Sequence, residues 1–202
     1  EHFINSCFIF IERFKKMKVN LIAVDEAHCI SQWGYDFRPP YLEIAQIREF
    51  HPNVPCLALT ASATLKVKAD IIEKLELKKP SVFVRSFSRK NLSYSVRLVE
   101  NKLEKAIEIL NKIPGSAIIY VRNRKGTKDI ANVLNQMGIS ASFYHAGLDN
   151  ETRDKRQNEW KKNQIRIIVA TNAFGMGIDK PDVRVVIHMD LPENLENYYQ
   201  EA

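Results

Sequence analysis

The stretch Leu21-Ile22-Ala23-Val24-Asp25-Glu26-Ala27-His28 joins four apolar residues directly to two neighbouring carboxylates. An apolar run without alternation is typical of a strand buried on both faces, as in a parallel α/β sheet. Because burying an unpaired carboxylate is costly, we expect Asp25 and Glu26 at the carboxyl end of this strand, where open α/β sheets bind ligands. One acid there can hold Mg²⁺ on a nucleoside triphosphate while its neighbour polarises the attacking water. The alternative is an acid pair that only begins a loop or caps a helix.

The composition sets broad limits. The chain has 202 residues, enough for one large domain or two small ones, and 45% of them are hydrophobic. No segment approaches the ~20 apolar residues of a membrane span, so we expect no membrane partner. Cys7, Cys29 and Cys56 show neither metal-ligand spacing nor a disulfide framework, which indicates a reducing compartment. A net charge of +6 is compatible with a polyanion partner without requiring one.

Hydrophobic periodicity and turn residues predict an alternation of helices and strands. Helices are expected over 3–17, 39–47, 67–75, 103–113, 130–137 (with Gly138 at its C-terminal cap) and from a cap at Asp149 or Asn150 to Trp160. Strands are expected over 21–24, 56–59, 82–84, 117–121, 141–144, 165–170 and 183–188, and the chain ends within what looks like another helix. Residues 86–95 are polar without sustained periodicity, so we place a domain boundary there, between 1–88 and 89–202. This alternation favours an α/β fold with parallel sheets and right-handed crossovers.

An aromatic-rich, non-periodic segment follows the acid pair. Residues 28–41 hold one Trp, two Tyr and one Phe beside Arg38. Stacking of a nucleic-acid base on an aromatic ring contributes ~1–3 kcal/mol, and Arg38 can add phosphate contact or cation–π attraction. The alternative is a small satellite core under a loop.

Two further groups of polar residues follow predicted strands. Thr60, Ser62 and Thr64 can hydrogen-bond the acid pair, although Ser62 or Thr64 can equally well cap the next helix. The second group combines hydroxyl, amide and glycine residues that let a phosphate approach the backbone, or that simply form a tight turn. It consists of Thr171, Asn172, Gly175, Gly177 and Asp179. The basic helix with Arg153, Lys155, Arg156, Lys161 and Lys162 is interpreted as a solvated face.

Together these motifs resemble those of a helicase family over nearly the whole chain. Residues 25–28 resemble the DEAH form of the Walker B motif of superfamily 2 helicases, and residues 29–39 resemble the aromatic-rich loop of the RecQ DNA helicases. Residues 60–64 are similar to motif III, 144–148 and 170–184 to the second motor domain up to motif V, and 198–202 to the lead-in to motif VI.

The resemblance implies two tandem RecA-like parallel-sheet domains, both truncated: the C-terminal part of the first in 1–88 and most of the second in 89–202. It implies an ATP-dependent 3′-to-5′ DNA helicase of recombination and repair, with ATP and Mg²⁺ as cofactors and single-stranded and duplex DNA as partners. Catalytic roles fall to Asp25 (the Mg²⁺ ligand), Glu26 and His28. Roles in ATP binding and coupling fall to Thr60, Ser62, Thr64, Gly177, Asp179 and Gln200. DNA-binding roles fall to Gln32, Trp33, Phe37, Arg38, Asn123, His145, Gly147, Thr171, Asn172 and Gly175.

One expected element of such a motor does not occur in the 202 residues. A phosphate-binding loop ends in Gly-Lys-Thr or Gly-Lys-Ser, and neither occurs, so we expect this loop before residue 1 and the arginines of motif VI beyond residue 202. We therefore expect the 202-residue chain alone not to hydrolyse ATP. Two other functions stay open: an RNA helicase of the DEAD/DEAH groups and a non-hydrolysing nucleic-acid scaffold. The resemblance favours the bacterial cytoplasm, or the nucleus in a eukaryote.

Overall fold

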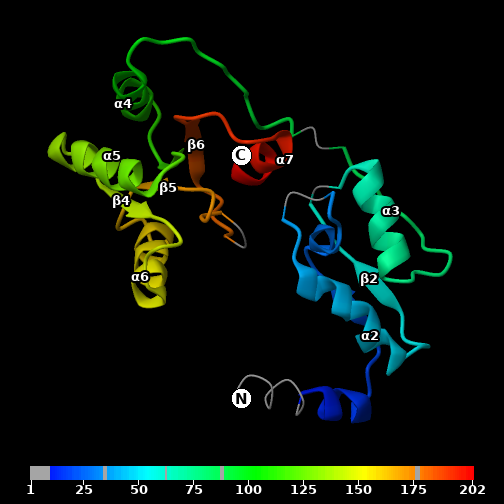
Figure 1. Ribbon diagram of the computed structural model, residues 1–202. Coiled ribbons are helices and arrows are strands. Elements are labelled where there is room, and N and C mark those ends of the chain that lie inside the picture. Colours follow the sequence, from blue (N-terminus) through cyan, green and yellow to red (C-terminus); the bar gives the residue numbers. More distant parts are fainter. Residues whose placement is uncertain (1–9, 34–35, 62, 87–88, 176–177) are drawn as a thin grey trace. The chain divides into compact units, whose positions relative to one another are not determined.

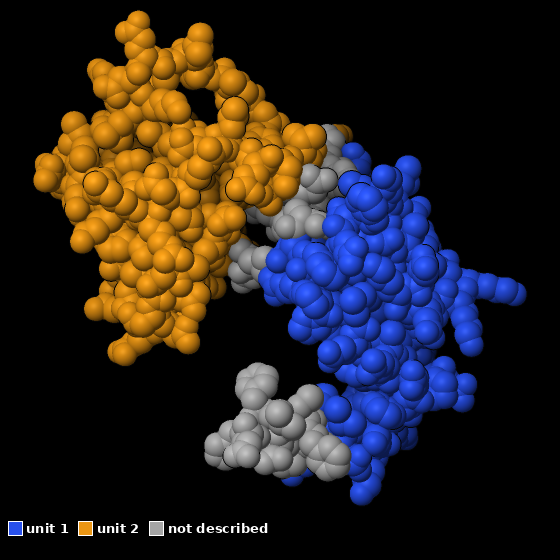
Figure 2. Space-filling model, in the orientation of Figure 1, with its two compact units in different colours: residues 1–88 blue, residues 89–202 orange. Residues whose placement is uncertain are grey.

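The computed structural model describes residues 10–33, 36–61, 63–86, 89–175 and 178–202, without the side chains of residues 196 and 200. The chain forms two compact units, residues 1–88 and residues 89–202 (Figures 1 and 2). Each unit contains a parallel sheet and helices, as the alternation of periodic segments predicted. Within the described ranges, no helix combines the length and apolar character needed to cross a bilayer.

The first unit is built on a two-stranded parallel sheet. Residues 10–16 are helical, and the predicted residues 3–9 of that helix lie outside the described part. The remaining elements are β1 (Ile22–Val24), the 3₁₀ helices η1 (Ala27–Ile30) and η2 (Pro39–Glu43), α2 (Ile44–Glu49), β2 (Cys56–Ala58) and α3 (Leu65–Lys74). Helix α3 packs Val67 and Ile71 against Val24 and Ile30, and this contact forms the core of the unit.

The expectation that β1 is buried on both faces is wrong. Ala23 pairs with Leu57 across the two strands, and both side chains are exposed, Leu57 to 43%. The core around α3 covers only the face that carries Val24. An apolar run therefore identified the strand correctly but could not show how many of its faces are covered.

The predicted strand at Val82–Val84 is also wrong. These residues have no regular secondary structure, and the Phe83 side chain is 93% exposed. A strand requires a neighbour to accept and donate its backbone hydrogen bonds, and no ladder partner for this segment exists among the described residues. Local β propensity is therefore not enough here.

The second unit holds a four-stranded parallel sheet in the order β4-β5-β3-β6. Its elements are α4 (Lys102–Lys112), β3 (Ser116–Tyr120), α5 (Arg124–Gln136), β4 (Ala141–Tyr144), α6 (Asn150–Lys161), β5 (Ile167–Ala170), β6 (Val183–His188) and α7 (Leu195–Glu201). Asp149 accepts a hydrogen bond from the Thr152 amide at the start of α6, which confirms the predicted cap. Gly138 follows α5 at a φ of 76°, as expected for a C-terminal glycine.

Both faces of this sheet carry a core. Leu110 and Leu134 pack on one face with Ile119, and Trp160 and Phe174 pack on the other, so β3 is buried along its whole length. Because all four strands are parallel, their carboxyl ends lie at one edge of the sheet. The segments that begin at residues 121, 145, 171 and 189 therefore leave the sheet at that edge.

Candidate functional site

The acid pair follows β1 directly, as predicted. Asp25 is exposed, and its Oδ1 accepts a hydrogen bond of 2.8 Å from the Glu26 amide. Glu26 has a φ of 49°, in the left-handed region. The next amide, of Ala27, donates to the Leu59 carbonyl at 2.8 Å, which closes this turn against the segment after β2. Two carboxylates thus project from a tight turn at the end of the strand.

His28 connects the two strand ends. Its side chain is 1% exposed, and Nδ1 lies 3.3 Å from Glu26 Oε2 and 3.0 Å from Thr60 Oγ1. Burial lowers the pKa of His28, against the opposing effect of the Glu26 carboxylate. The ring is therefore neutral at pH 7. Because a carboxylate only accepts hydrogen bonds, the nearby Glu26 favours the tautomer with the proton on Nδ1.

A run of contacts continues from His28 into the aromatic-rich loop. Cys29 Sγ lies 3.6 Å from His28 Nε2 and 3.8 Å from Asp36 Oδ2, and the same Asp36 oxygen lies 2.5 Å from Arg38 Nη2. Burial raises the pKa of the Cys29 thiol to about 11, and the Asp36 charge adds to the effect. No role was predicted for Cys29 or Asp36, because the three cysteines are widely spaced and show no metal-ligand spacing.

The aromatic-rich loop presents Trp33 outward. Its side chain is 67% exposed, and the Lys66 ammonium lies 4.7 Å from the ring centroid. The loop is anchored by Ser31, whose hydroxyl donates to Asp70 at 2.6 Å and accepts from the Trp33 amide at 3.1 Å. The alternative of a satellite core is therefore wrong for Trp33. Gln32 is also exposed, whereas Phe37 is half-buried.

Two of the three hydroxyl residues after β2 are described, and they make different contacts. Thr60 contacts His28, whereas Thr64 caps α3 by accepting a hydrogen bond from the Val67 amide at 3.4 Å. Ser62 lies outside the described residues. The local alternative, a helix cap, thus holds at Thr64.

At the carboxyl edge of the second sheet, side chains with helix-capping and turn-closing roles surround the end of β3. Asn123 is the N-cap of α5, and its side-chain oxygen accepts from the Gly126 amide at 2.7 Å. The Arg122 amide donates to Asp190 at 3.0 Å, which ties the end of β3 to the end of β6. Asn123 therefore has a structural role beside its predicted contact with DNA.

The Arg124 side chain fills the space beside Gly147, a residue predicted to bind DNA. A Cβ atom at Gly147 would lie 2.7 Å from Arg124 Nη1 and 3.3 Å from His145 Nδ1. Burial, together with the Arg124 charge, lowers the pKa of His145. These three residues form a corner at the end of β4 whose positive charge comes from Arg124.

The interpretation of the basic helix as a solvated face is wrong for Arg156. On α6, this side chain donates to the Phe143 carbonyl at 2.6 Å, and its guanidinium carbon lies 3.8 Å from the Phe143 ring centroid. The Phe143 ring in turn lies 5.8 Å from the His145 ring. Phe143 therefore lies between Arg156 and His145, and the contact of Arg156 with Phe143 could not be inferred from the periodicity of α6 alone.

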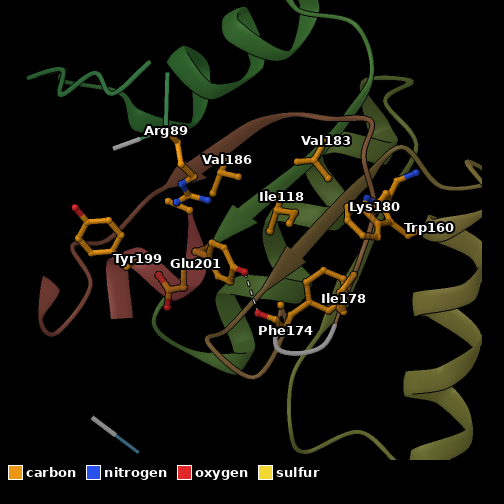
Figure 3. Close-up of a pocket in the computed structure, with 13 residues that line it drawn as sticks. Arg89, Ile118, Trp160, Phe174, Ile178, Lys180, Val183, Val186, Tyr199 and Glu201 are labelled. Atoms are coloured by element: carbon orange, nitrogen blue, oxygen red, sulfur yellow. Dashed lines mark hydrogen bonds between the residues drawn. The ribbon is translucent and has the colours of Figure 1, made fainter. Parts of the chain in front are cut away.

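The loop after β5 carries the remaining predicted residues. Thr171 is buried, Asn172 and Asp179 are exposed, and Gly175 has a φ of 124° that requires glycine. Gly175 also lines a cavity of about 230 Å³ in this unit (Figure 3). In that view the dashed line marks the bond of 2.9 Å from the Tyr120 hydroxyl to the Phe174 carbonyl, which fixes the loop. Gly177 lies outside the described residues, as does the side chain of Gln200 in α7.

A known protein family matches the second unit. Residues 101–202, half of the chain, match the family described as the helicase conserved C-terminal domain. The chain belongs to this helicase family. The second unit, which contains the four-stranded parallel sheet, is thus a helicase domain.

Several individual relatives of this helicase segment are named as DNA helicases of the RecQ type, and one is named as a putative RNA helicase. The segment is 46% identical over 192 residues to ATP-dependent DNA helicase Q-like 2 of Arabidopsis thaliana, which covers 92% of this chain and 27% of that protein. The segment is 41% identical over 194 residues to ATP-dependent DNA helicase RecQ of Pasteurella multocida, and this match covers 96% of this chain and 31% of that protein. The segment is 50% identical over 185 residues to a putative ATP-dependent RNA helicase, R290, of Acanthamoeba polyphaga mimivirus. This match covers 91% of this chain and 34% of that protein. The resemblance to RecQ helicases is confirmed, and the chain spans about a third or less of these relatives.

A solved structure shares the fold of the helicase segment. The helicase Lhr of Mycobacterium smegmatis, bound to single-stranded DNA and AMP-PNP, matches with a TM-score of 0.75 and 18% identity. The match covers 95% of this chain and 27% of that one. The predicted α/β, RecA-like parallel-sheet fold is confirmed.

Proposed function

We propose that the chain is the motor segment of a RecQ-type, ATP-dependent DNA helicase, with residues 1–88 and 89–202 belonging to two successive RecA-like domains. The whole protein would couple ATP hydrolysis to 3′-to-5′ movement on single-stranded DNA and to duplex unwinding. The observation that carries this proposal is the run of contacts from Glu26 through His28, Cys29 and Asp36 to Arg38. It joins a carboxylate suited to water activation to a loop suited to nucleic acid.

The acid pair supplies two different functions in this proposal. Asp25 would hold Mg²⁺, because its exposed carboxylate offers the oxygen ligands this ion prefers and is oriented by the Glu26 amide. When bound with ATP, Mg²⁺ neutralises charge on the phosphates. Glu26 would accept a proton from the attacking water, with His28 holding the carboxylate in position and Thr60 contacting His28.

The loop would report the presence of DNA to Glu26. The exposed Trp33 ring can stack on a base, and the adjacent Lys66 adds positive charge. A DNA phosphate near Arg38 would compete with Asp36 for the guanidinium, and Asp36 contacts the Cys29 thiol next to His28. DNA binding would thereby change the surroundings of the histidine that contacts Glu26.

The second unit would contact the DNA backbone and the nucleotide. Its proposed DNA contacts lie at the carboxyl edge of the sheet and in the loop after β5: Asn123, His145, Gly147, Thr171, Asn172 and Gly175. Gly177, Asp179 and Gln200 are proposed to serve ATP binding and coupling, together with Thr60, Ser62 and Thr64 of the first unit. Backbone contacts of this kind bind nucleic acid without reading its sequence.

The test is a Glu26→Gln substitution in the full-length protein, which keeps the shape of the side chain and removes the base. We expect ATP hydrolysis in the presence of single-stranded DNA to fall about 10²–10⁴-fold while a fluorescent ATP analogue still binds. Glu49→Gln, at an exposed position at the end of α2, is the matched control. Hydrolysis at the wild-type rate by Glu26→Gln, or no hydrolysis by the wild type, would refute the motor and favour a scaffold.

A second candidate function is RNA unwinding, because one relative at 50% identity carries the name of a putative RNA helicase. The two functions differ in which strand stimulates hydrolysis. Single-stranded DNA and RNA of one sequence, compared at equal salt, separate them. We expect the DNA strand to give the larger stimulation, and a larger effect of RNA would favour the second function.

A further inference from the structure

Three potential metal ligands meet between η1 and the aromatic-rich loop. The imidazole of His28, the thiol of Cys29 and the carboxylate of Asp36 each offer one atom, and these atoms lie within 4.8 Å of one another. His28 and Cys29 are 1% exposed, whereas the Asp36 side chain is 29% exposed. The cluster is therefore buried on two sides and open to solvent on the third.

The spacing of these atoms fits a tetrahedral ion. With Zn–N of about 2.0–2.1 Å and Zn–S of about 2.3 Å, ligand atoms around tetrahedral zinc lie roughly 3.3–3.8 Å apart. The measured separations are 3.6 Å from His28 Nε2 to Cys29 Sγ and 3.8 Å from Cys29 Sγ to Asp36 Oδ2. The third separation, from His28 to Asp36, is at most 4.8 Å, so a rotation of the partly exposed Asp36 side chain brings the three ligand atoms to bonding distance.

The surroundings of the imidazole also suit a metal ligand. Metal-bound histidines usually donate the other ring N–H to a carboxylate or another oxygen, which fixes the tautomer. Here the opposite nitrogen, Nδ1, faces Glu26 Oε2 at 3.3 Å and Thr60 Oγ1 at 3.0 Å. This arrangement directs a lone pair on Nε2 toward the Cys29 sulfur.

We propose that His28 Nε2, Cys29 Sγ and Asp36 Oδ2 form a Zn²⁺ site, with water as the fourth ligand on the exposed Asp36 side. An imidazole, a thiolate and one carboxylate favour Zn²⁺ over Mg²⁺, which prefers oxygen ligands alone. As the sulfur–zinc bond forms, the thiol proton passes to solvent. The ion joins the loop that carries Asp36 directly to η1. The site is distinct from the proposed Mg²⁺ ligand Asp25.

Cobalt titration of the full-length protein tests the site without relying on ATP hydrolysis. Co²⁺ bound by a thiolate in tetrahedral geometry gives near-ultraviolet charge-transfer absorption and intense visible bands. We expect Cys29→Ser to bind one equivalent of Co²⁺ less than the wild type and to lose the corresponding absorption. Cys56→Ser removes the other described cysteine of this unit and should retain it. Zn²⁺ added to the wild type should displace the Co²⁺.

A second substitution makes the test independent of how well Cys29→Ser folds. Asp36→Asn changes a partly exposed side chain, so we expect an unchanged unfolding midpoint and Co²⁺ affinity at least about tenfold weaker at this site. Equal Co²⁺ stoichiometry in wild type and Cys29→Ser would overturn the proposal. Unchanged affinity in Asp36→Asn would overturn it as well. Either outcome leaves the proposed helicase function intact.

Discussion

Gly147 is the residue where a single added methyl group would most directly disturb a proposed DNA contact. Its missing Cβ would lie 2.7 Å from Arg124 Nη1, the end of a flexible side chain. In Gly147→Ala we expect Arg124 to swing away at little cost in stability, while affinity for single-stranded DNA falls several-fold. Fluorescence anisotropy with a labelled oligonucleotide measures the affinity, and denaturant unfolding measures the stability.

Gly138→Ala is the matched control for that substitution. Nothing lies within 4 Å of its Cβ position, but its φ of 76° disfavours any side chain. We expect a loss of about 1–2 kcal/mol in unfolding free energy with unchanged DNA affinity. Equal DNA affinity in Gly147→Ala and Gly138→Ala would argue against a DNA contact at this corner.

The lowered pKa of His145 gives a pH dependence with a definite sign. Its pKa lies below the ordinary value of 6.5 in the folded state, because burial and Arg124 disfavour the charged ring. The folded state therefore binds fewer protons than the unfolded chain, and this contribution to stability is present above pH 6.5 and lost as the pH falls below it. We expect the stability of the wild type relative to His145→Gln to decrease between pH 7 and pH 5. A pH-independent difference in their unfolding free energies would contradict this assignment.

Among the helices, α5 combines a structural and a proposed binding role in one residue. Asn123 caps this helix through its side-chain oxygen. Asn123→Ala should cost about 1 kcal/mol in unfolding free energy through loss of the cap alone. Asn123→Asp keeps the cap but adds negative charge, so we expect wild-type stability and weaker DNA binding. If Asn123→Asp binds DNA like the wild type, the residue serves only as a cap.

Sequence reasoning located those elements whose burial follows from local pattern. Apolar runs identified β3, β4, β5 and β6 to within about two residues, because neighbouring strands and helices cover both faces of the central strands. The same reasoning failed at 82–84, where no partner strand exists in the described part of the chain. Strand pairing is a long-range property, and a short apolar run carries no information about it.

In the candidate site, the positions of single residues were predictable from the sequence, but the contacts between them were not. Asp25, Glu26 and Trp33 lie where their positions after a strand or in a loop suggested, at the surface. The contacts through Cys29 and Asp36 depend on how the loop folds back on η1, which residue spacing does not encode. Arg156 was misinterpreted because its partner, Phe143, comes from a different element.

At the scale of the whole chain, the segment between the two cores exposes its described residues to proteases. Val96 and Leu98 are 98% and 104% exposed, and residues 93–99 have no regular secondary structure. We expect limited proteolysis to cut first within roughly residues 80–100, since proteases require an extended, accessible backbone. Mass spectrometry of the early fragments identifies the sites. Early cleavage inside α5 or α6 would contradict the described packing of the second unit.

The left-handed backbone at Glu26 lowers the free energy of unfolding of the whole molecule. A non-glycine residue at a φ of 49° is disfavoured by about 1–2 kcal/mol, and glycine would relieve it. In the full-length protein, Glu26→Gly should therefore raise the melting temperature while abolishing the proposed ATP hydrolysis. Selection for thermal robustness alone would discard the glutamate, so thermostabilising libraries built on this scaffold need an activity screen at that position.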